Sequence, residues 1–224
     1  HGAAEHTQAA QPAPEIAAPP APKPQRTSTA ANAEGPVGQA WSELGMLGLD
    51  GTRLDQNRVI AAHRIDPAHA AFDVLRTRLL QVLAEKGWRR VAITSPTADC
   101  GKTFLTANLA ISLSRQENCR TLVMDTDLRN VGLAKTLGVR APGAIGSLLR
   151  GSRSPRDHLL RLGDNDFEAG HNLAFALNDT PEPYASELLQ DPRTAQAITE
   201  IERRYDPDVM LFDMPPALVS DDVM

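Results

Sequence analysis

The sequence predicts an α/β domain whose parallel sheet is covered by helices on both faces, and three observations support this. Apolar segments of strand length alternate with segments of helical periodicity in the second part of the chain. The strands are apolar nearly throughout, as is typical of strands buried on both faces. Polar clusters directly follow three of them, at the sheet edge where ligands bind in such folds: 95–103, 125–127 and Asp213.

The first 55 residues are predicted to be a disordered Ala/Pro-rich arm preceding the domain. Between Ala9 and Ala33 the chain consists mostly of Ala, Pro, Gln, Ser and Thr, a composition that cannot bury a core. Its prolines exclude a continuous helix or strand: Pro12, Pro14, Pro19, Pro20, Pro22 and Pro24. Residues 56–224 are expected to form one domain, incomplete at its C-terminal end because the chain stops just after an apolar strand.

Composition excludes several functional classes. The net charge is −5 and no extended basic block stands out, which argues against nucleic acid as the main partner. Cys100 lies in a loop and Cys119 after the following helix, so no structural disulfide is expected. No segment approaches the roughly 20 apolar residues of a membrane helix, and no leader pattern is visible. We therefore expect a soluble cytoplasmic protein.

The elements follow in order from periodicity and from breaker residues. Helices are expected at about 66–86, 102–116, 133–137, 145–149, 186–189 and 194–205, and strands at 89–94, 120–125, 172–177 and 208–213. The first helix should begin with Asp66 as its N-cap and Pro67 at its first position, and end at Gly87. The inward faces of the first and last helices are expected to comprise Ala68, Phe72, Leu75, Leu79 and Val82, and Ala195, Ile198, Ile201 and Tyr205.

The segment from Ser95 to Thr103 is predicted to be a phosphate-binding loop that leads into a helix. Such a loop turns backbone N–H groups toward phosphates, and supplies a Lys for the β/γ-phosphates and a hydroxyl for Mg²⁺. Gly101, Lys102 and Thr103 fit these roles, although Pro96 stands where the consensus has Gly. The alternative is a surface turn after a core strand. The predicted ATP contacts are Thr97, Ala98, Asp99, Cys100, Gly101, Lys102, Thr103, Phe104 and Arg129.

Three carboxylates close two of the predicted strands. Asp213 could orient waters around Mg²⁺, or could simply cap a turn. Asp125 and Asp127 are two residues apart in an extended segment, so both could face one cleft. One of them could hold the metal shell while the other accepts a proton from an attacking hydroxyl. Arg129 could stabilise phosphate charge or form a surface ion pair.

These motifs resemble those of a known family. Thr94-Ser95 with Gly101-Lys102-Thr103, then Asp125-Thr-Asp127-Leu-Arg129, then Asp213-Met-Pro-Pro are similar to the Walker A, A′ and B motifs of bacterial tyrosine kinases of capsule and exopolysaccharide synthesis. That family belongs to the P-loop NTPase superfamily and is related to partition-type ATPases. The resemblance spans roughly residues 59–224.

The resemblance implies tyrosine autophosphorylation with ATP and Mg²⁺, in the control of polysaccharide synthesis and export. It also implies a location at the inner face of the plasma membrane and activation by a membrane-spanning co-polymerase. Carried over by position, the catalytic residues are Lys102, Asp125 and Asp127, and the metal residues are Thr103, Asp125 and Asp213.

The chain departs from the family pattern at three places. Met214 replaces a usual Ser or Thr after Asp213. The family's subunit-contact motif falls on Ala70, Asp73 and Arg76 and keeps only its last residue, so self-association through it is in doubt. The family's C-terminal tyrosine cluster is not visible, and Tyr184 and Tyr205 are both expected to be structural.

Two other functions stay open from the sequence. A partition-type or division-type ATPase switch usually carries a second Lys five positions before the loop Lys, where this chain has Thr97. A catalytically weak ATP-binding adaptor of a membrane partner is compatible with the departures just described.

Overall fold

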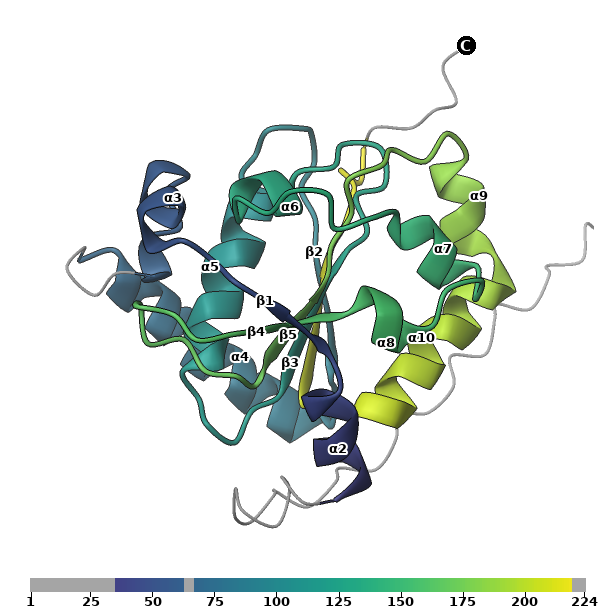
Figure 1. The fold of residues 1–224 in the computed structure, drawn as a ribbon. Helices are drawn as coiled ribbons and strands as arrows, with labels where there is room; N and C mark the ends of the chain where they lie inside the picture. The colour runs from purple at the N-terminus through teal and green to yellow at the C-terminus, as the bar shows by residue number, and fades with distance from the viewer. Residues whose placement is uncertain (1–34, 63–66, 219–224) are drawn as a thin grey trace, which may run out of the picture.

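The computed structural model describes residues 35–62 and 67–218 (Figure 1). Within these residues six strands form one sheet in the order β1-β4-β5-β3-β6-β2. The strands are β1 Gly45–Leu47, β2 Arg90–Ile93, β3 Thr121–Asp125, β4 Leu160–Leu162, β5 Leu173–Ala176 and β6 Val209–Asp213. All neighbouring pairs are parallel except β4 and β5, which are antiparallel. The predicted parallel sheet is thus confirmed for the adjacent strands β5, β3, β6 and β2, and corrected at the antiparallel pairing of β4 with β5.

Helices cover both faces of the sheet, as predicted (Figure 1). The helices on one face are α3 Gly51–Gln56, η1 Ile60–Ala62, α4 His69–Lys86, α5 Lys102–Ser114 and α6 Leu133–Thr136. Those on the other face are α2 Pro36–Ser42, α7 Ile145–Leu149, α8 Pro155–His158, α9 Ala185–Gln190 and α10 Pro192–Tyr205. Together with the sheet they make the three-layer architecture of a P-loop NTPase fold.

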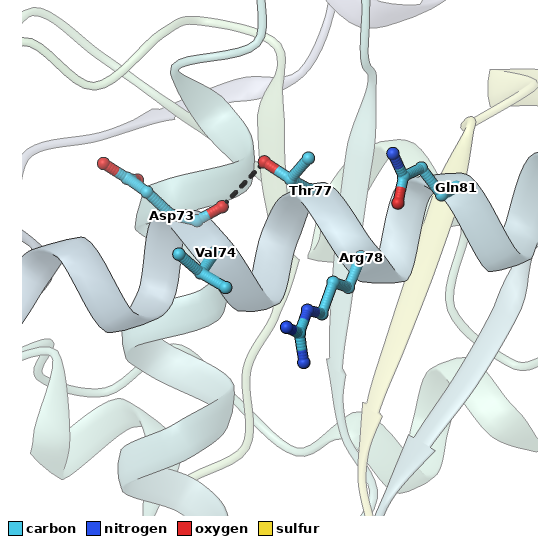
Figure 2. Close-up of a pocket in the computed structure, with 5 residues that line it drawn as sticks. All are labelled: Asp73, Val74, Thr77, Arg78 and Gln81. Carbon is cyan, nitrogen blue, oxygen red and sulfur yellow. Dashed lines mark hydrogen bonds between the residues drawn. The ribbon is translucent and has the colours of Figure 1, made fainter.

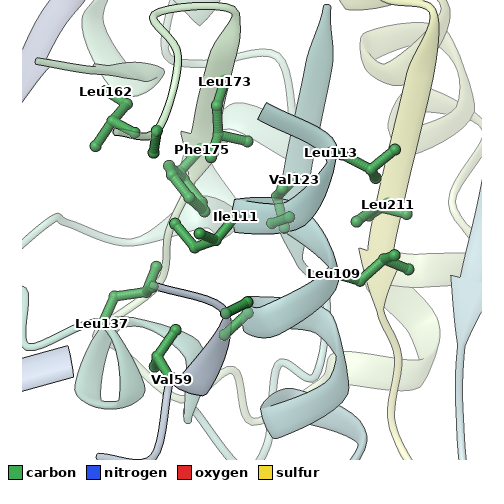
Figure 3. Packing of buried hydrophobic residues seen from close by; sticks show 14 of the residues in the cluster. Val59, Leu109, Ile111, Leu113, Val123, Leu137, Leu162, Leu173, Phe175 and Leu211 are labelled. Atoms are coloured by element: carbon green, nitrogen blue, oxygen red, sulfur yellow. The ribbon is translucent and has the colours of Figure 1, made fainter. Parts of the chain in front are cut away.

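Two hydrophobic clusters fill the space between the sheet and its two helical layers. Successive side chains of a strand point to opposite faces, so Val123 of β3 joins one cluster while Leu122 and Met124 join the other. Every residue of β3 and β6 is buried, which explains their continuous apolar sequence. Figure 3 shows the first cluster, where Ile111 of α5 packs near Phe175 of β5. This packing fixes α5, the helix that follows the phosphate loop, against the sheet.

The N-terminal boundary of the domain differs from the sequence prediction. Residues 35–55, assigned there to the disordered arm, form α2, β1 and most of α3 and pack on the domain. Trp41 of α2 is 4% exposed, and its indole Nε1 donates to the carbonyl oxygen of Tyr205 at 2.7 Å. Burial of a large aromatic ring outweighs the weak local signal of these short elements. Residues 1–34 lie outside the described residues, and the arm stays a prediction there.

We call residues 35–62 the N-terminal strap, because they cross from one helical layer to the other. Past β1, the strap reaches the two helices that border the phosphate loop and the end of β3. Asn57 Nδ2 donates to the carbonyl oxygens of Lys135 and Thr136 in α6. Asn108 of α5 is buried, and its Oδ1 accepts the backbone N–H of Ala61 at 2.8 Å. The strap therefore braces α5 and α6 from outside.

Helix α4 differs from its prediction in start and phase. It begins at His69 after Ala68, whereas the proposed cap Asp66 lies outside the described residues. Its end at Gly87, with φ of 66°, is as predicted. The buried residues are Phe72 and Leu83, while Leu75 and Val82 are exposed. The predicted inward face was wrong because this stretch contains six leucines and valines, which form more than one apolar stripe along a helix.

The remaining predicted elements are present, with bounds shifted by up to two residues. Helix α10 begins at Pro192 after the cap Asp191, whose side chain accepts from the N–H of Arg193. Its buried face includes Thr194, Ile201 and Tyr205, and the predicted inward residue Ala195 is exposed. Beyond the predicted elements, the described residues include the short helix α8, the edge strand β1 and its neighbour β4. As predicted, neither Cys100 nor Cys119 forms a disulfide.

Among the described helices, none has both the length and the hydropathy needed to cross a bilayer.

Candidate nucleotide-binding site

The loop between β2 and α5 is a compact turn that leads into a helix N-terminus. Ser95 Oγ donates to the carbonyl oxygen of Thr97 at 2.6 Å, and Thr97 Oγ1 lies 3.2 Å from Cys100 Sγ. Gly101 has φ of 84° and is the N-cap of α5, a conformation that glycine adopts at no steric cost. A turn of this kind before a helix exposes backbone N–H groups and the positive end of the helix dipole, which together bind anions.

Asp99 is the unusual residue of this loop. Its φ of 60° lies in the left-handed region, which few non-glycine residues adopt. It is also exposed and carries a carboxylate where the bound group is expected to be anionic. The carboxylate of Asp99 therefore opposes phosphate binding electrostatically, and its left-handed backbone adds local strain to the loop.

The first two turns of α5 supply polar groups toward the sheet edge. Lys102 and Thr103 begin the helix, and Thr106 Oγ1 lies 3.3 Å from Asp213 Oδ1. The side chain of Phe104 packs edge-on against Phe72, with ring centroids 6.0 Å apart. The ring of Phe104, predicted as an ATP contact, thus packs between α4 and α5.

Asp125 and Asp213 lie directly opposite each other at the ends of β3 and β6, and both are fully buried. Thr126 joins the two strand ends, because its N–H and its hydroxyl both donate to the carbonyl oxygen of Asp213, at 2.9 and 2.8 Å. The same hydroxyl oxygen lies 3.2 Å from Met214 Sδ. The methionine sulfur thus lies beside Thr126.

Lys102 is paired within the protein. Its Nζ lies 2.7 Å from Asp127 Oδ2, and the two side chains are only 9% and 0% exposed. Asp127 Oδ1 also accepts the N–H of Asn130 at 3.2 Å. The ammonium group of Lys102 is therefore held by Asp127.

The two opposed carboxyl groups are costly to ionise together. Burial, and after it the nearby charge of Asp213, raise the pKa of Asp125 from 3.8 to about 8. The pKa of Asp213 is also raised, chiefly by burial, while the hydroxyl of Thr103 and the charge of Lys102 act in the opposite direction. Bringing a cation to this edge of the sheet would relieve both costs.

The hydrogen bonding of these carboxyl groups also indicates that a cation would be stabilised at this edge of the sheet. Within the described part of the chain, neither carboxylate oxygen of Asp125 has a hydrogen-bond partner, and Asp213 Oδ2 has none. The backbone N–H of Leu133 faces Asp125 and lowers its pKa, but it does not form a hydrogen bond of normal geometry. Buried polar atoms are normally satisfied in folded proteins. These oxygens therefore fit a ligand such as the water shell of a metal ion.

The donor set suits Mg²⁺ held jointly with phosphates. No group of three or more His, Cys, Asp or Glu side chains in residues 35–62 and 67–218 is arranged to hold a metal alone. Mg²⁺ commonly uses one or two carboxylates, several waters and substrate phosphates instead of an all-protein cage. Thr103, Asp125 and Asp213 fit this pattern.

A segment that the sequence did not connect with the site lies along its border. We call residues 178–186 the rim segment. Its Glu182 donates a backbone N–H to the carbonyl oxygen of Leu128 at 2.8 Å, next to Asp127. Arg129 Nη2 lies 3.4 Å from Ser186 Oγ, and Arg150 Nη2 pairs with Glu182 Oε2 at 2.7 Å. The rim segment is thus attached to the chain that follows β3.

The predicted site residues are only partly gathered in one place. Those brought together at the carboxyl edge of the central strands are Lys102, Thr103, Asp125, Asp127 and Asp213. Thr97, Ala98, Asp99, Cys100 and Gly101 form the loop, and Arg129 contacts Ser186 on the rim segment. Sequence reasoning missed Thr106 and Thr126. Their signals were present, since Thr106 is one helical turn after Lys102 and Thr126 stands between two aspartates.

A second hollow lies away from this site, on the outer surface of α4. Figure 2 shows five side chains that line a shallow pocket of about 400 Å³: Asp73, Val74, Thr77, Arg78 and Gln81. Thr77 Oγ1 donates to the carbonyl oxygen of Asp73 within the helix. Val74, Leu75 and Val82 are exposed on the same helix.

Comparison with known proteins gives a consistent set of similarities. No family model matches the chain. The chain is 32% identical over 174 residues to a putative tyrosine-protein kinase EpsB of Ralstonia solanacearum, covering 76% of this chain and 22% of that protein. It is 29% identical over 171 residues to tyrosine-protein kinase Wzc of Salmonella typhi, with shares of 76% and 22%. It therefore spans about a fifth of the length of the curated relatives it matches.

Solved structures agree with these sequence relatives. The BceF tyrosine kinase domain matches with a TM-score of 0.60 and 26% identity, covering 79% of this chain and 71% of that one. The kinase domain of the Escherichia coli tyrosine kinase ETK matches with a TM-score of 0.61 and 25% identity, covering 73% and 61%.

Proposed function

This chain belongs to the bacterial tyrosine kinase family of P-loop proteins, and from that membership we propose that it is an ATP-dependent kinase domain acting on protein tyrosine. The observation that carries the proposal is the meeting of Lys102 and Thr103 with three buried carboxylates, Asp125, Asp127 and Asp213. A loop lysine, a hydroxyl and carboxylates at strand ends are the parts that phosphoryl transfer needs.

Each side chain of the site has a step to perform. Bound Mg²⁺ and ATP would supply the γ-phosphoryl group and neutralise charge on it. Thr103, Asp125 and Asp213 would hold the metal and its waters, and the start of α5 would face the phosphates. Once Lys102 turns to the phosphates, Asp127 loses its cation partner. Asp127 can then accept the proton of an attacking hydroxyl.

The test of this proposal uses the full-length protein with γ-labelled ATP and Mg²⁺. We expect label on tyrosine that is lost in Lys102→Met and retained in Lys86→Met, a matched change on the exposed surface of α4. Asp127→Asn should lose phosphoryl transfer while keeping nucleotide, measured by binding of a fluorescent ATP analogue. Release of inorganic phosphate without labelled protein would instead support an ATPase switch.

A catalytically weak nucleotide-binding adaptor is the second candidate, and two residues favour it. The carboxylate of Asp99 opposes phosphates in the loop. Met214 occupies the position where the family pattern usually has the hydroxyl of Ser or Thr. Asp99→Gly removes both the charge and the conformational strain, and Met214→Ser restores a hydroxyl beside Thr126. If the natural chain binds ATP without turnover and this double variant turns it over, the adaptor reading is correct.

For the biological role, we propose regulation of exopolysaccharide or capsule synthesis by a protein located at the inner face of the plasma membrane. The partner would be a membrane-spanning co-polymerase whose cytoplasmic tail activates the kinase. The family resemblance supports this role. Adding the purified tail should increase the rate of tyrosine labelling, and an unchanged rate over a range of tail concentrations would contradict it.

Self-association is proposed to use the outer face of α4 and not an ionic ring. At the positions of the family's contact motif, Arg76 Nη1 pairs with Asp73 Oδ1 at 2.9 Å and donates to Ser112 in α5, so these charges are used within the chain. The exposed apolar side chains Val74 and Val82 are available instead. Sedimentation velocity should show weak association that Val74→Asp abolishes, and a monomer at all concentrations would exclude it.

A further inference from the structure

The two tyrosines of the chain differ sharply in accessibility. Tyr205 ends α10 with 0% of its surface exposed, and its ring packs edge-on against Trp41 with centroids 6.5 Å apart. Its hydroxyl oxygen is buried. Tyr184 is 68% exposed, so the expectation that both tyrosines are structural is wrong for it. In the folded domain, only Tyr184 can present its hydroxyl to a phosphoryl donor.

Tyr184 is also attached to the border of the nucleotide site. It lies in the rim segment directly before α9, two residues after Glu182. The N–H of Glu182 binds the carbonyl oxygen of Leu128, the residue next to Asp127. On its other side, Ser186 lies 3.4 Å from Arg129. The exposed phenol is therefore carried by a segment connected at both ends to the chain that leaves the catalytic carboxylates.

The ion pair beneath the segment keeps it in this place. Arg150 in the turn after α7 pairs with Glu182 at 2.7 Å, and Glu182 is the less exposed partner at 15%. Gly146 makes room for the pair, because an added Cβ there would lie 2.7 Å from Arg150 Nη1 and 2.9 Å from Glu182 Oε2. The backbone of the rim segment is thus fixed while the side chain of Tyr184 projects to solvent.

From these observations we propose that Tyr184 is a phosphoryl acceptor of this domain, an inference that rests on the kinase function proposed above. In the reaction, the phenolic oxygen of Tyr184 forms a bond to the γ-phosphorus of ATP. The bond from that phosphorus to the β–γ bridging oxygen breaks, and ADP leaves with its electron pair. The phenolic proton passes to one of the carboxylates at the end of β3. No oxidant or reductant is needed, and ATP is the only co-substrate.

The experiment maps the label by residue in the full-length protein. Trypsin separates the two tyrosines, because residues 162–193 form one peptide with Tyr184 and Tyr205 follows Arg204 on another. After incubation with γ-labelled ATP and Mg²⁺, we expect label on the 162–193 peptide. That label should be lost in Lys102→Met and in Tyr184→Phe, and should persist in Tyr205→Phe, the matched loss of a tyrosine hydroxyl.

An added synthetic copolymer of Glu and Tyr separates failure of the acceptor from failure of the enzyme. Tyr184→Phe should phosphorylate this copolymer at the natural rate, because Tyr184 is an acceptor and not part of the catalytic site. Tyrosine label on the copolymer or elsewhere in the protein, with none on the 162–193 peptide, would overturn the inference and leave the kinase function standing. Label confined to Tyr205 would overturn it as well. No label on either protein or copolymer despite bound nucleotide would overturn both proposals.

Discussion

The opposed carboxyl groups at the ends of β3 and β6 make the stability of the ligand-free domain depend on pH between about 4 and 8. The pKa of Asp125 is raised from 3.8 to about 8, so between these values the folded state keeps a proton that the unfolded state has released. Stability is then unaffected by Asp125 below about pH 4, falls as pH rises, and levels off above pH 8. Asp125→Asn removes this titration and replaces the protonated acid with a group of the same shape.

The size of the effect follows from the shift. A rise from 3.8 to about 8 corresponds to roughly 5 to 6 kcal/mol when fully developed. At pH 5 about 2 kcal/mol of this is already lost, so the advantage of Asp125→Asn over the natural protein should grow by about 4 kcal/mol between pH 5 and pH 9. The pKa of Asp213 is also raised, chiefly by burial, but Asp213 is present in both proteins, so its own titration largely cancels from the comparison.

Urea unfolding of the nucleotide-free protein in EDTA, at pH 5, 7 and 9, measures this difference. Glu117→Gln, which replaces an exposed carboxylate just after α5, is the control and should show no such pH dependence. Equal stability differences for Asp125→Asn at pH 5 and pH 9 would refute the reasoning. Adding Mg²⁺ and a non-hydrolysable ATP analogue at pH 8 should stabilise the natural protein more than the variant, since only the natural protein has the carboxylate charge to neutralise.

Three further predictions concern the packing around the site. Asn108→Ala should lower the free energy of unfolding by about 2 kcal/mol in urea, because the Ala61 N–H and the Phe104 carbonyl oxygen each lose a hydrogen-bond partner. A decrease below 0.5 kcal/mol, about the scale of a neutral surface change, would contradict the bracing role of Asn108. Gly146→Ala should destabilise the natural chain more than it destabilises an Arg150→Ala chain, because its Cβ would meet Arg150 Nη1; additive effects in a double-mutant cycle would disprove the contact. Trp41→Phe keeps an aromatic ring but loses part of the buried indole and its hydrogen bond to Tyr205, and should cost at least about 1 kcal/mol. Trp88→Phe at a 52% exposed position should be neutral, and equal effects of the two would count against docking of α2.

The central part of the fold was accessible from sequence because local pattern and tertiary position agree there. Strands β3 and β6 are apolar throughout and end in Asp125 and Asp213, and parallel pairing brings such ends to one edge. The meeting of these carboxylates with the loop of Gly101 and Lys102 followed from that rule alone. The pairing of Lys102 with Asp127 did not, because it depends on side-chain geometry across the edge.

The edges of the fold were missed for a different physical reason. Strands β1 and β4 are three residues each and pair with each other across more than 110 residues of sequence, so neither has a local signal. The predicted buried face of α4 was wrong because Asp73 and Arg76 contact Ser112 of α5, and hydrophobic periodicity does not reveal such a polar contact. The place of Tyr184 likewise depends on the tertiary hydrogen bond between Glu182 and Leu128.

The hydrogen bond of Trp41 to Tyr205 joins residues 164 positions apart. As a ribosome releases the chain from its N-terminus, the strap emerges early, but α10 emerges only when most of the domain has been synthesised. The ring of Trp41 stays exposed to solvent until then, and contacts between residues so far apart in the sequence form slowly. The docking of α2 on α10 is therefore expected to be a late step in the folding of this domain. The contacts of Asn57 and Asn108 with α6 and α5 need only residues up to 136, so we expect the second half of the strap to dock before α2 does.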